Sequence, residues 1–149
     1  MRGAHYGLLL QDLFRIKCHI TMDIINTNLK ILIVDDTPIV LERLFEMIAE
    51  LDTVHSVLKS NSYNQTVEFI KLGEPDVILL DLQLRGKSGI ELLKYVKKHH
   101  ASVKTIIVTN SASVFYREQC QSLGADYFID KSTEFENIPG IIDAISTSN

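Results

Sequence analysis

Residues 30–38 read KILIVDDTP, an apolar run that ends in two adjacent carboxylates, Asp35 and Asp36. The run contains no alternating polar residues, and such continuous hydrophobicity is typical of a parallel strand that is covered on both faces. Thr37 can cap a helix, and Pro38 suits the first helical position because its φ is fixed and it lacks an N–H. The two carboxylates are therefore predicted to lie on a strand-to-helix turn.

The alternation of apolar runs and helical patterns continues to the end of the chain. Further strands are expected at residues 54–59, 77–80, 103–108 and 127–129. Helices are expected at residues 37–51, 63–72, 88–100, 113–123 and 137–145. Five strands that alternate with five helices predict an α/β fold with a parallel sheet covered on both faces. Right-handed crossovers favour a flavodoxin-like, doubly wound sheet of order 2-1-3-4-5.

Several local features are expected within this pattern. Residues 54–59 are mixed in polarity, which suits a strand at the edge of the sheet. Ile39 belongs to the apolar face that is predicted for the first helix. Gly73 and Gly124 stand where the second and fourth helices should end, a position that favours glycine.

Length and composition restrict the class of protein. A chain of 149 residues suits one domain with a substantial core. Its net charge of −4 argues against nucleic acid as the main partner, because phosphate binding needs a basic face. No apolar run approaches the ~20 residues of a transmembrane helix, and no signal peptide is recognisable. We expect a cytoplasmic protein without membrane insertion, in which Cys18 and Cys120 are reduced thiols.

Residues 1–28 precede the first strand and have an amphipathic pattern of their own. Apolar residues recur at helical spacing at Leu9, Leu13, Ile16 and Ile20. The pattern indicates a short helix that either docks or dimerises, or packs on its own domain. Alternatively, the segment is upstream sequence absent from the mature protein, since Met22 could be the start. The expected organisation is an extension at residues 1–28 and one domain at residues 29–149.

Polar side chains are predicted at the carboxyl ends of four strands. They are Asp35, Asp36, Asp81, Thr109 and Lys131. In open α/β sheets these strand ends share one edge, and the crevice between the first and third strands is the default ligand site. Taken singly, each residue has an ordinary explanation, such as a helix-capping Asp or a solvated Lys. Only the complete set indicates a binding site.

The chemistry of this set suits a divalent cation. Three crowded carboxylates repel one another, and a bound cation relieves that repulsion. Oxygen ligands without His or Cys favour Mg²⁺ or Mn²⁺ over zinc. Thr109 can donate a hydrogen bond, and Lys131 supplies a compact positive charge. Grouped around one acid, a metal, a hydroxyl and an ammonium form a receptor for a phosphoryl group on that acid.

Four motifs resemble the receiver domain of two-component response regulators. They are Asp35-Asp36, DLQLRGKSG from Asp81, TNS from Thr109 and GADYFIDKS from Gly124. The motifs stand in the family's order and spacing, and the resemblance extends over residues 29–146. The chain resembles single-domain receivers of the chemotaxis-regulator kind.

The resemblance implies a role for each acidic residue of the site. Asp81 is the phospho-acceptor and also a metal ligand. Asp36 contacts the metal directly, and Asp35 assists through water. The backbone carbonyl of Gln83 completes the protein's share of the metal shell.

The resemblance also implies how the signal is received and passed on. Thr109 and Lys131 bind the phosphoryl oxygens, and Thr109 with Phe128 forms the conformational switch. The phosphoryl group comes from a histidine kinase or a phosphotransfer protein. Because the sequence ends soon after the fifth helix, we expect a single-domain regulator that signals by protein–protein contacts. It is not an enzyme beyond catalysing its own phosphorylation and dephosphorylation.

Three alternatives use different chemistry. A haloacid-dehalogenase-type phosphatase has a second Asp two residues after its nucleophile, but Thr37 and Gln83 follow Asp35 and Asp81 at that spacing. A flavodoxin-like electron carrier needs a Ser/Thr/Gly-rich phosphate-binding loop after the first strand. The third alternative is a receiver-like adaptor that binds its partners without phosphorylation, although all five site residues are present.

Overall fold

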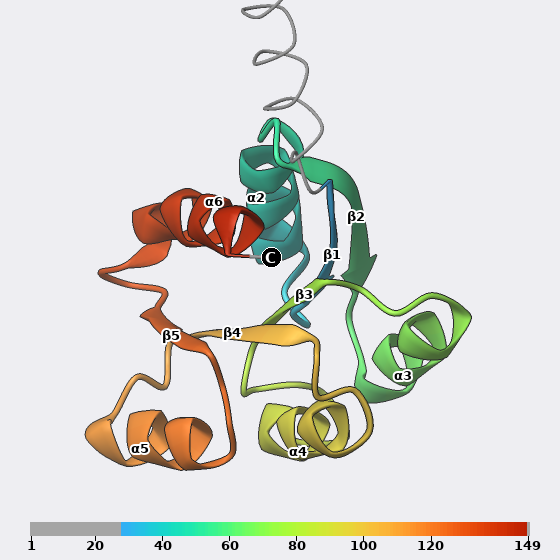
Figure 1. Ribbon diagram of the computed structural model, residues 1–149. Coiled ribbons are helices and arrows are strands. Elements are labelled where there is room, and N and C mark those ends of the chain that lie inside the picture. Colours follow the sequence, from blue (N-terminus) through green and yellow to red (C-terminus); the bar gives the residue numbers. More distant parts are fainter. Residues whose placement is uncertain (1–27, 149) are drawn as a thin grey trace, which may run out of the picture.

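A five-stranded parallel sheet forms the centre of the computed structural model, which describes residues 28–148 (Figure 1). The strands are β1 (Leu29–Val34), β2 (Val54–Ser60), β3 (Val77–Leu80), β4 (Lys104–Thr109) and β5 (Tyr127–Asp130). The helices are α2 (Pro38–Ala49), α3 (Tyr63–Leu72), α4 (Gly89–His99), α5 (Val114–Ser122) and α6 (Ile138–Thr147), with a 3-10 turn η1 (Phe135–Asn137) before α6. The strand order β2-β1-β3-β4-β5 confirms the predicted flavodoxin-like topology, with β2 at a sheet edge.

Side chains of each central strand alternate between two hydrophobic cores. In β1, Leu29, Ile31 and Ile33 join the core beneath α2 and α6, whereas Leu32 and Val34 join the core shared with α3, α4 and α5. Figure 1 shows these two groups of helices on opposite sides of the sheet. Each of the five side chains is at most 2% exposed, and full burial of one aliphatic side chain contributes roughly 1.5–3 kcal/mol. The continuous apolar run therefore serves both faces of the sheet.

The turn after β1 uses its polar groups differently from the prediction. α2 begins at Pro38, and Thr37 occupies the N-cap position, but its side chain does not cap the helix. The Thr37 hydroxyl donates to Asp36 Oδ1 at 3.4 Å, and the Thr37 N–H donates to Asp35 Oδ1 at 2.8 Å. The turn is thus held by the carboxylates, which also fixes their directions.

The expected inward position of Ile39 is wrong. The buried stripe of α2 runs through Leu41, Leu44 and Ile48, at the spacing of successive helical turns. Ile39 lies two residues before Leu41, which turns it away from this stripe, and it is 77% exposed. It is an exposed apolar side chain three residues after Asp36.

The two glycines at helix ends differ in what they require. Gly124, after α5, has φ +92°, a conformation that favours glycine, as its predicted position implies. Gly73 forms the C-cap of α3 with φ −172°, an extended conformation open to any residue. The end of α3 therefore does not depend on glycine.

The predicted N-terminal helix and Cys18 lie outside the described residues. Cys120 is a buried free thiol in α5. Among the helices between residues 28 and 148, none combines the length and hydrophobicity needed to cross a bilayer.

Candidate functional site

The register of the central strands places Asp35 and Asp81 side by side. Val34 pairs with Leu80 in the parallel β1–β3 ladder, so the residue after each of them stands at the same sheet edge. The Asp81 N–H donates to the Val34 carbonyl at 2.9 Å. Strand order reverses between β1 and β3, so the two carboxylates lie in the predicted crevice.

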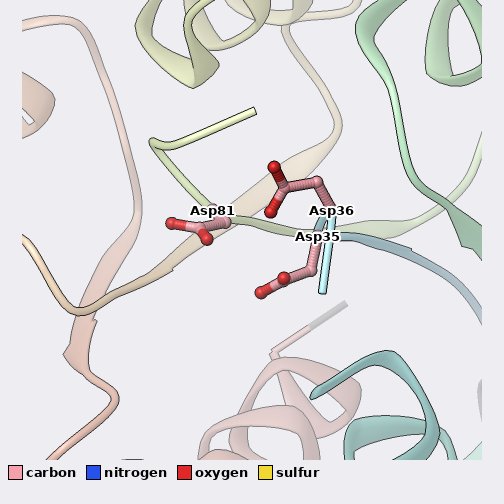
Figure 2. Close-up of side chains that lie close together, drawn as sticks. All are labelled: Asp35, Asp36 and Asp81. Atoms are coloured by element: carbon pink, nitrogen blue, oxygen red, sulfur yellow. The ribbon is translucent and has the colours of Figure 1, made fainter. Parts of the chain in front are cut away.

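Three carboxylates converge at this edge (Figure 2). Asp35, Asp36 and Asp81 each offer an oxygen, and these oxygens lie within 4.8 Å of one another. Asp35 and Asp81 are buried, whereas Asp36 is half-buried. The donor set fits Mg²⁺, since its oxygens are hard ligands and the half-buried side leaves room for the waters that Mg²⁺ retains.

Lys131 supplies the counter-charge to this cluster. Its Nζ donates to Asp35 Oδ2 at 2.5 Å and to Asp81 Oδ2 at 2.8 Å, and its side chain is only 7% exposed. Lys131 follows β5, and its N–H donates to the Thr109 carbonyl at 3.0 Å. The exposed Arg85 adds a second cation, with its Nε 3.9 Å from Asp36 Oδ2. Because two cations cannot balance three carboxylates, the site retains an excess of negative charge that attracts a metal ion.

Burial and pairing act against each other at Asp35 and Lys131. Burial raises the pKa of Asp35 above its usual value, although hydrogen bonds from Lys131 and the Thr37 N–H act to lower it. At Lys131 burial acts to lower the pKa, but the hydrogen bonds and negative charges of Asp35 and Asp81 outweigh it and raise the pKa. Lys131 is therefore a stable positive charge beside Asp81 at neutral pH.

Thr109 and Gln83 belong to the loops around the acceptor position. Thr109 is fully buried at the end of β4, and its Oγ1 accepts from the Ser111 N–H at 3.1 Å. The Gln83 N–H donates to Asp81 Oδ1 at 3.2 Å, and its side-chain amide donates to Ser111 Oγ at 2.8 Å. Gln83 thus connects the loop after β3 with the loop after β4. The predicted role of its carbonyl as a metal ligand stays a prediction.

Gly89 is a site residue that the sequence did not single out. A Cβ atom at this position would lie 2.1 Å from the Asp81 carbonyl oxygen and 2.7 Å from Leu82 Cα. The first residue of α4 therefore packs directly on the backbone of Asp81, which only glycine permits. Its place at the end of the DLQLRGKSG motif was the available signal, but the spacing alone does not reveal the contact.

Phe128, the predicted switch residue, lies half-buried in β5 against the core shared with α3, α4 and α5. The guanidinium of Arg117 covers its ring, with Arg117 Cζ 4.6 Å from the ring centroid. The sequence does not reveal the contact of Arg117, since nothing in a helical pattern shows which neighbouring strand a charged side chain reaches. The structure thus brings all five polar site residues to one edge and places Phe128 on β5, two strands from Asp81.

A flavodoxin-like sheet with three carboxylates and a lysine at its switch point defines a class of domains built around one acidic site. Comparison with known families places the chain within this class. The model of the response regulator receiver domain matches residues 31–143. The chain therefore belongs to the receiver domain family of two-component response regulators.

Curated relatives in this family are longer than the present chain. EvgA, a DNA-binding transcriptional activator of Escherichia coli K12, is 28% identical over 115 residues, which cover 76% of this chain and 55% of EvgA. The Fimbriae Z protein of the same strain is 25% identical over 108 residues, which cover 72% of this chain and 51% of that protein. The chain spans about half the length of these relatives.

Solved structures share the fold. The receiver domain of the Francisella response regulator 1452 superposes with a TM-score of 0.74 at 19% identity, over 81% of this chain and 98% of that one. The RcsB response regulator of Salmonella typhimurium gives a TM-score of 0.76 at 22% identity, over 83% of this chain and 62% of that one. At these identities the likeness establishes the fold alone.

Proposed function

We propose that this receiver domain accepts a phosphoryl group on Asp81 from a histidine kinase or a phosphotransfer protein, in a Mg²⁺-dependent reaction. The observation that carries the proposal is the position of Asp81. One of its carboxylate oxygens lies within 4.8 Å of a carboxylate oxygen of Asp35 and of Asp36. Lys131 Nζ lies 2.8 Å from Asp81 Oδ2. An acid, an acidic pair suited to a metal and a fixed ammonium are the groups that phosphoryl transfer to a carboxylate requires.

The reaction exchanges one bond to phosphorus for another. A carboxylate oxygen of Asp81 attacks the phosphorus, the bond from phosphorus to the donor histidine nitrogen breaks, and the histidine takes up a proton. Lys131 holds positive charge beside the phosphoryl oxygens, and the Gln83 N–H keeps the Asp81 carboxylate oriented. Asp36, Asp81 and the Gln83 carbonyl would hold a Mg²⁺ ion, with Asp35 assisting, and the ion would neutralise further charge on the phosphoryl group. The chain catalyses only its own phosphorylation and dephosphorylation.

The output of the domain is proposed to be a change in protein–protein contacts in the cytoplasm. The buried Thr109 hydroxyl turns toward the phosphoryl oxygens, and Phe128 moves into the space that it vacates. EvgA is named as a DNA-binding transcriptional activator, and the present chain covers 55% of it. Output through DNA binding is therefore the second candidate. Binding of the phosphorylated chain to protein partners and to DNA has to be compared to decide between the two.

Acetyl phosphate with Mg²⁺ is expected to add one phosphoryl group to the purified chain, because the acceptor, the acidic pair and the ammonium are already in place. Intact-mass spectrometry measures the modification, and EDTA is expected to prevent it. Phosphotransfer from the histidine kinases of the source organism then identifies the donor. A chain that stays unmodified under all these conditions would favour the phosphorylation-independent adaptor.

Replacing Asp36 by Ala is expected to weaken Mg²⁺ binding by at least about tenfold, and more than replacing Asp35. Asp35 is nearly inaccessible and already binds Lys131 and the Thr37 N–H. The Asp36 side chain is 27% exposed, and its cationic partner is the exposed Arg85, at 3.9 Å. Calorimetric titration with Mg²⁺ compares the two variants. Glu42→Ala is the control, since this carboxylate pairs with Lys59 on the surface. Equal or reversed effects at Asp35 and Asp36 would contradict the assignment of the direct ligand.

A further inference from the structure

Three groups hold the side chain of Arg117 against the neighbouring strand. Its Nη1 donates to the Phe128 carbonyl at 3.2 Å, and its Nη2 donates to Glu134 Oε2 at 3.2 Å. Its Cζ lies 4.6 Å from the centroid of the Phe128 ring. A guanidinium can do this because its donors lie in its plane while its face stacks on an aromatic ring. Arg117 therefore holds both the backbone and the ring of Phe128.

Glu134 extends this arrangement to the segment that carries Lys131. Its Oε2 also accepts from the Asp130 N–H at 2.9 Å, and its own N–H donates to the Asp130 carbonyl at 2.8 Å. Asp130 is the last residue of β5 and directly precedes Lys131. One connected set of contacts thus runs from Arg117 in α5 through Glu134 to Asp130, the residue next to the site lysine.

Packing against the core encloses Phe128 only in part, because the residue is half-buried. A hollow of about 240 Å³ lies beside it, lined by Arg117, Gln121, Ala125, Asp126, Tyr127 and Phe128. Phe128 borders this hollow together with Arg117, and the Arg117 guanidinium stacks on the Phe128 ring and restrains it. In the same arrangement the Thr109 Oγ1 accepts from the Ser111 N–H of its own loop. While Arg117 stacks on the Phe128 ring, the Thr109 hydroxyl is therefore hydrogen-bonded within its own loop.

We propose that Arg117, anchored by Glu134, is a positioning residue that clamps Phe128 and so opposes the switch that follows phosphorylation of Asp81. The inference rests on the proposed function. Movement of the ring has to break the contact between Arg117 and Phe128, which lowers the population of the competent state. Apparent affinity for a phosphoryl mimic falls in proportion to that population. Loss of the clamp should therefore make the domain easier to activate.

Arg117→Met in the full chain tests the clamp, since methionine keeps much of the side-chain length without the charge or the donors. Beryllofluoride with Mg²⁺ serves as the phosphoryl mimic, and ¹⁹F NMR of fluorinated phenylalanine follows the ring, with Phe128→Leu identifying its resonance. The Phe128 signal is expected to shift before any mimic is added. Beryllofluoride should then bind roughly threefold to tenfold more tightly, as loss of one partly exposed cation–π contact and its hydrogen bonds implies.

The chain contains a matched control for this substitution. Arg43 also stacks on a phenylalanine, with its Cζ 4.2 Å from the Phe135 centroid, and its Nη2 pairs with Glu136 Oε1 at 2.9 Å. Arg43→Met removes the same kinds of contact away from Phe128, so it should leave beryllofluoride affinity and the Phe128 signal unchanged. Glu134→Gln should act in the same direction as Arg117→Met but more weakly.

The outcomes separate the clamp from the proposed function. Unchanged or weaker beryllofluoride binding by Arg117→Met, or an equal gain in Arg43→Met, would overturn the clamp. If the unsubstituted chain binds no beryllofluoride, the proposed function fails, and the clamp is then judged by the Phe128 resonance alone. In that case a signal unchanged between the unsubstituted chain and Arg117→Met overturns the clamp as well.

Discussion

Replacing Asp81 by Asn is expected to abolish phosphoryl transfer to the chain from both acetyl phosphate and a histidine kinase. Asparagine keeps the shape of the side chain but has no carboxylate to act as a nucleophile. Lys131 loses one of its two partners but keeps Asp35, and one of three crowded negative charges disappears. The free energy of unfolding should therefore change by less than about 1 kcal/mol.

Intact-mass spectrometry measures the modification of this variant, and urea unfolding shows whether it is folded. Asp52→Asn is the matched control, because Asp52 is an exposed carboxylate in the turn before β2 and should behave like the unsubstituted chain. A folded Asp81→Asn variant that is still modified at the normal level would show that another residue is the acceptor.

Replacing Gly89 by Ala is expected to destabilise the domain by at least about 3 kcal/mol, at the upper end of the cost of overpacking. The added Cβ would lie 2.1 Å from the Asp81 carbonyl oxygen and 2.7 Å from Leu82 Cα. Both are backbone atoms, so the strain cannot be relieved by rotating a side chain. Movement of α4 or of the Asp81 backbone would displace the acceptor, and phosphorylation should fall together with stability.

Gly140→Ala is the control for this substitution. Gly140 lies in α6, and a Cβ atom there has no neighbour within 4 Å. Alanine should stabilise this helix by roughly 0.5–1 kcal/mol, because it loses less conformational entropy than glycine. Urea unfolding compares the two variants. A Gly89→Ala variant as stable and as readily phosphorylated as the unsubstituted chain would refute the importance of the close contact.

Sequence patterns alone predicted the topology and the polar side chains that meet at one sheet edge. An apolar run without alternation has to be buried on both faces, and Ile33 and Val34 of β1 do enter different cores. Since parallel strands end at one sheet edge, Asp35 and Asp81 could be predicted to meet there. Both predictions depend only on the order of elements along the chain and on the periodicity of the strands.

The contacts between side chains depended on the tertiary structure. Lys131 pairs with both Asp35 and Asp81, which requires the register of β5 against β4 and of β1 against β3. The outward position of Ile39 follows from where the buried stripe of α2 meets the sheet. Periodicity shows that a helix has an apolar face, but not which residue at its margin is covered.

The sequence by itself determined the strand order and the sheet edge where the acids gather. The reason is that burial and chain direction follow from the local pattern of apolar and polar residues. Only the tertiary structure decided that Gly89 contacts the Asp81 backbone and that Arg117 covers Phe128. Both contacts join elements that are separate in sequence. They exist only once the helices have docked on the sheet, at distances that no local pattern specifies.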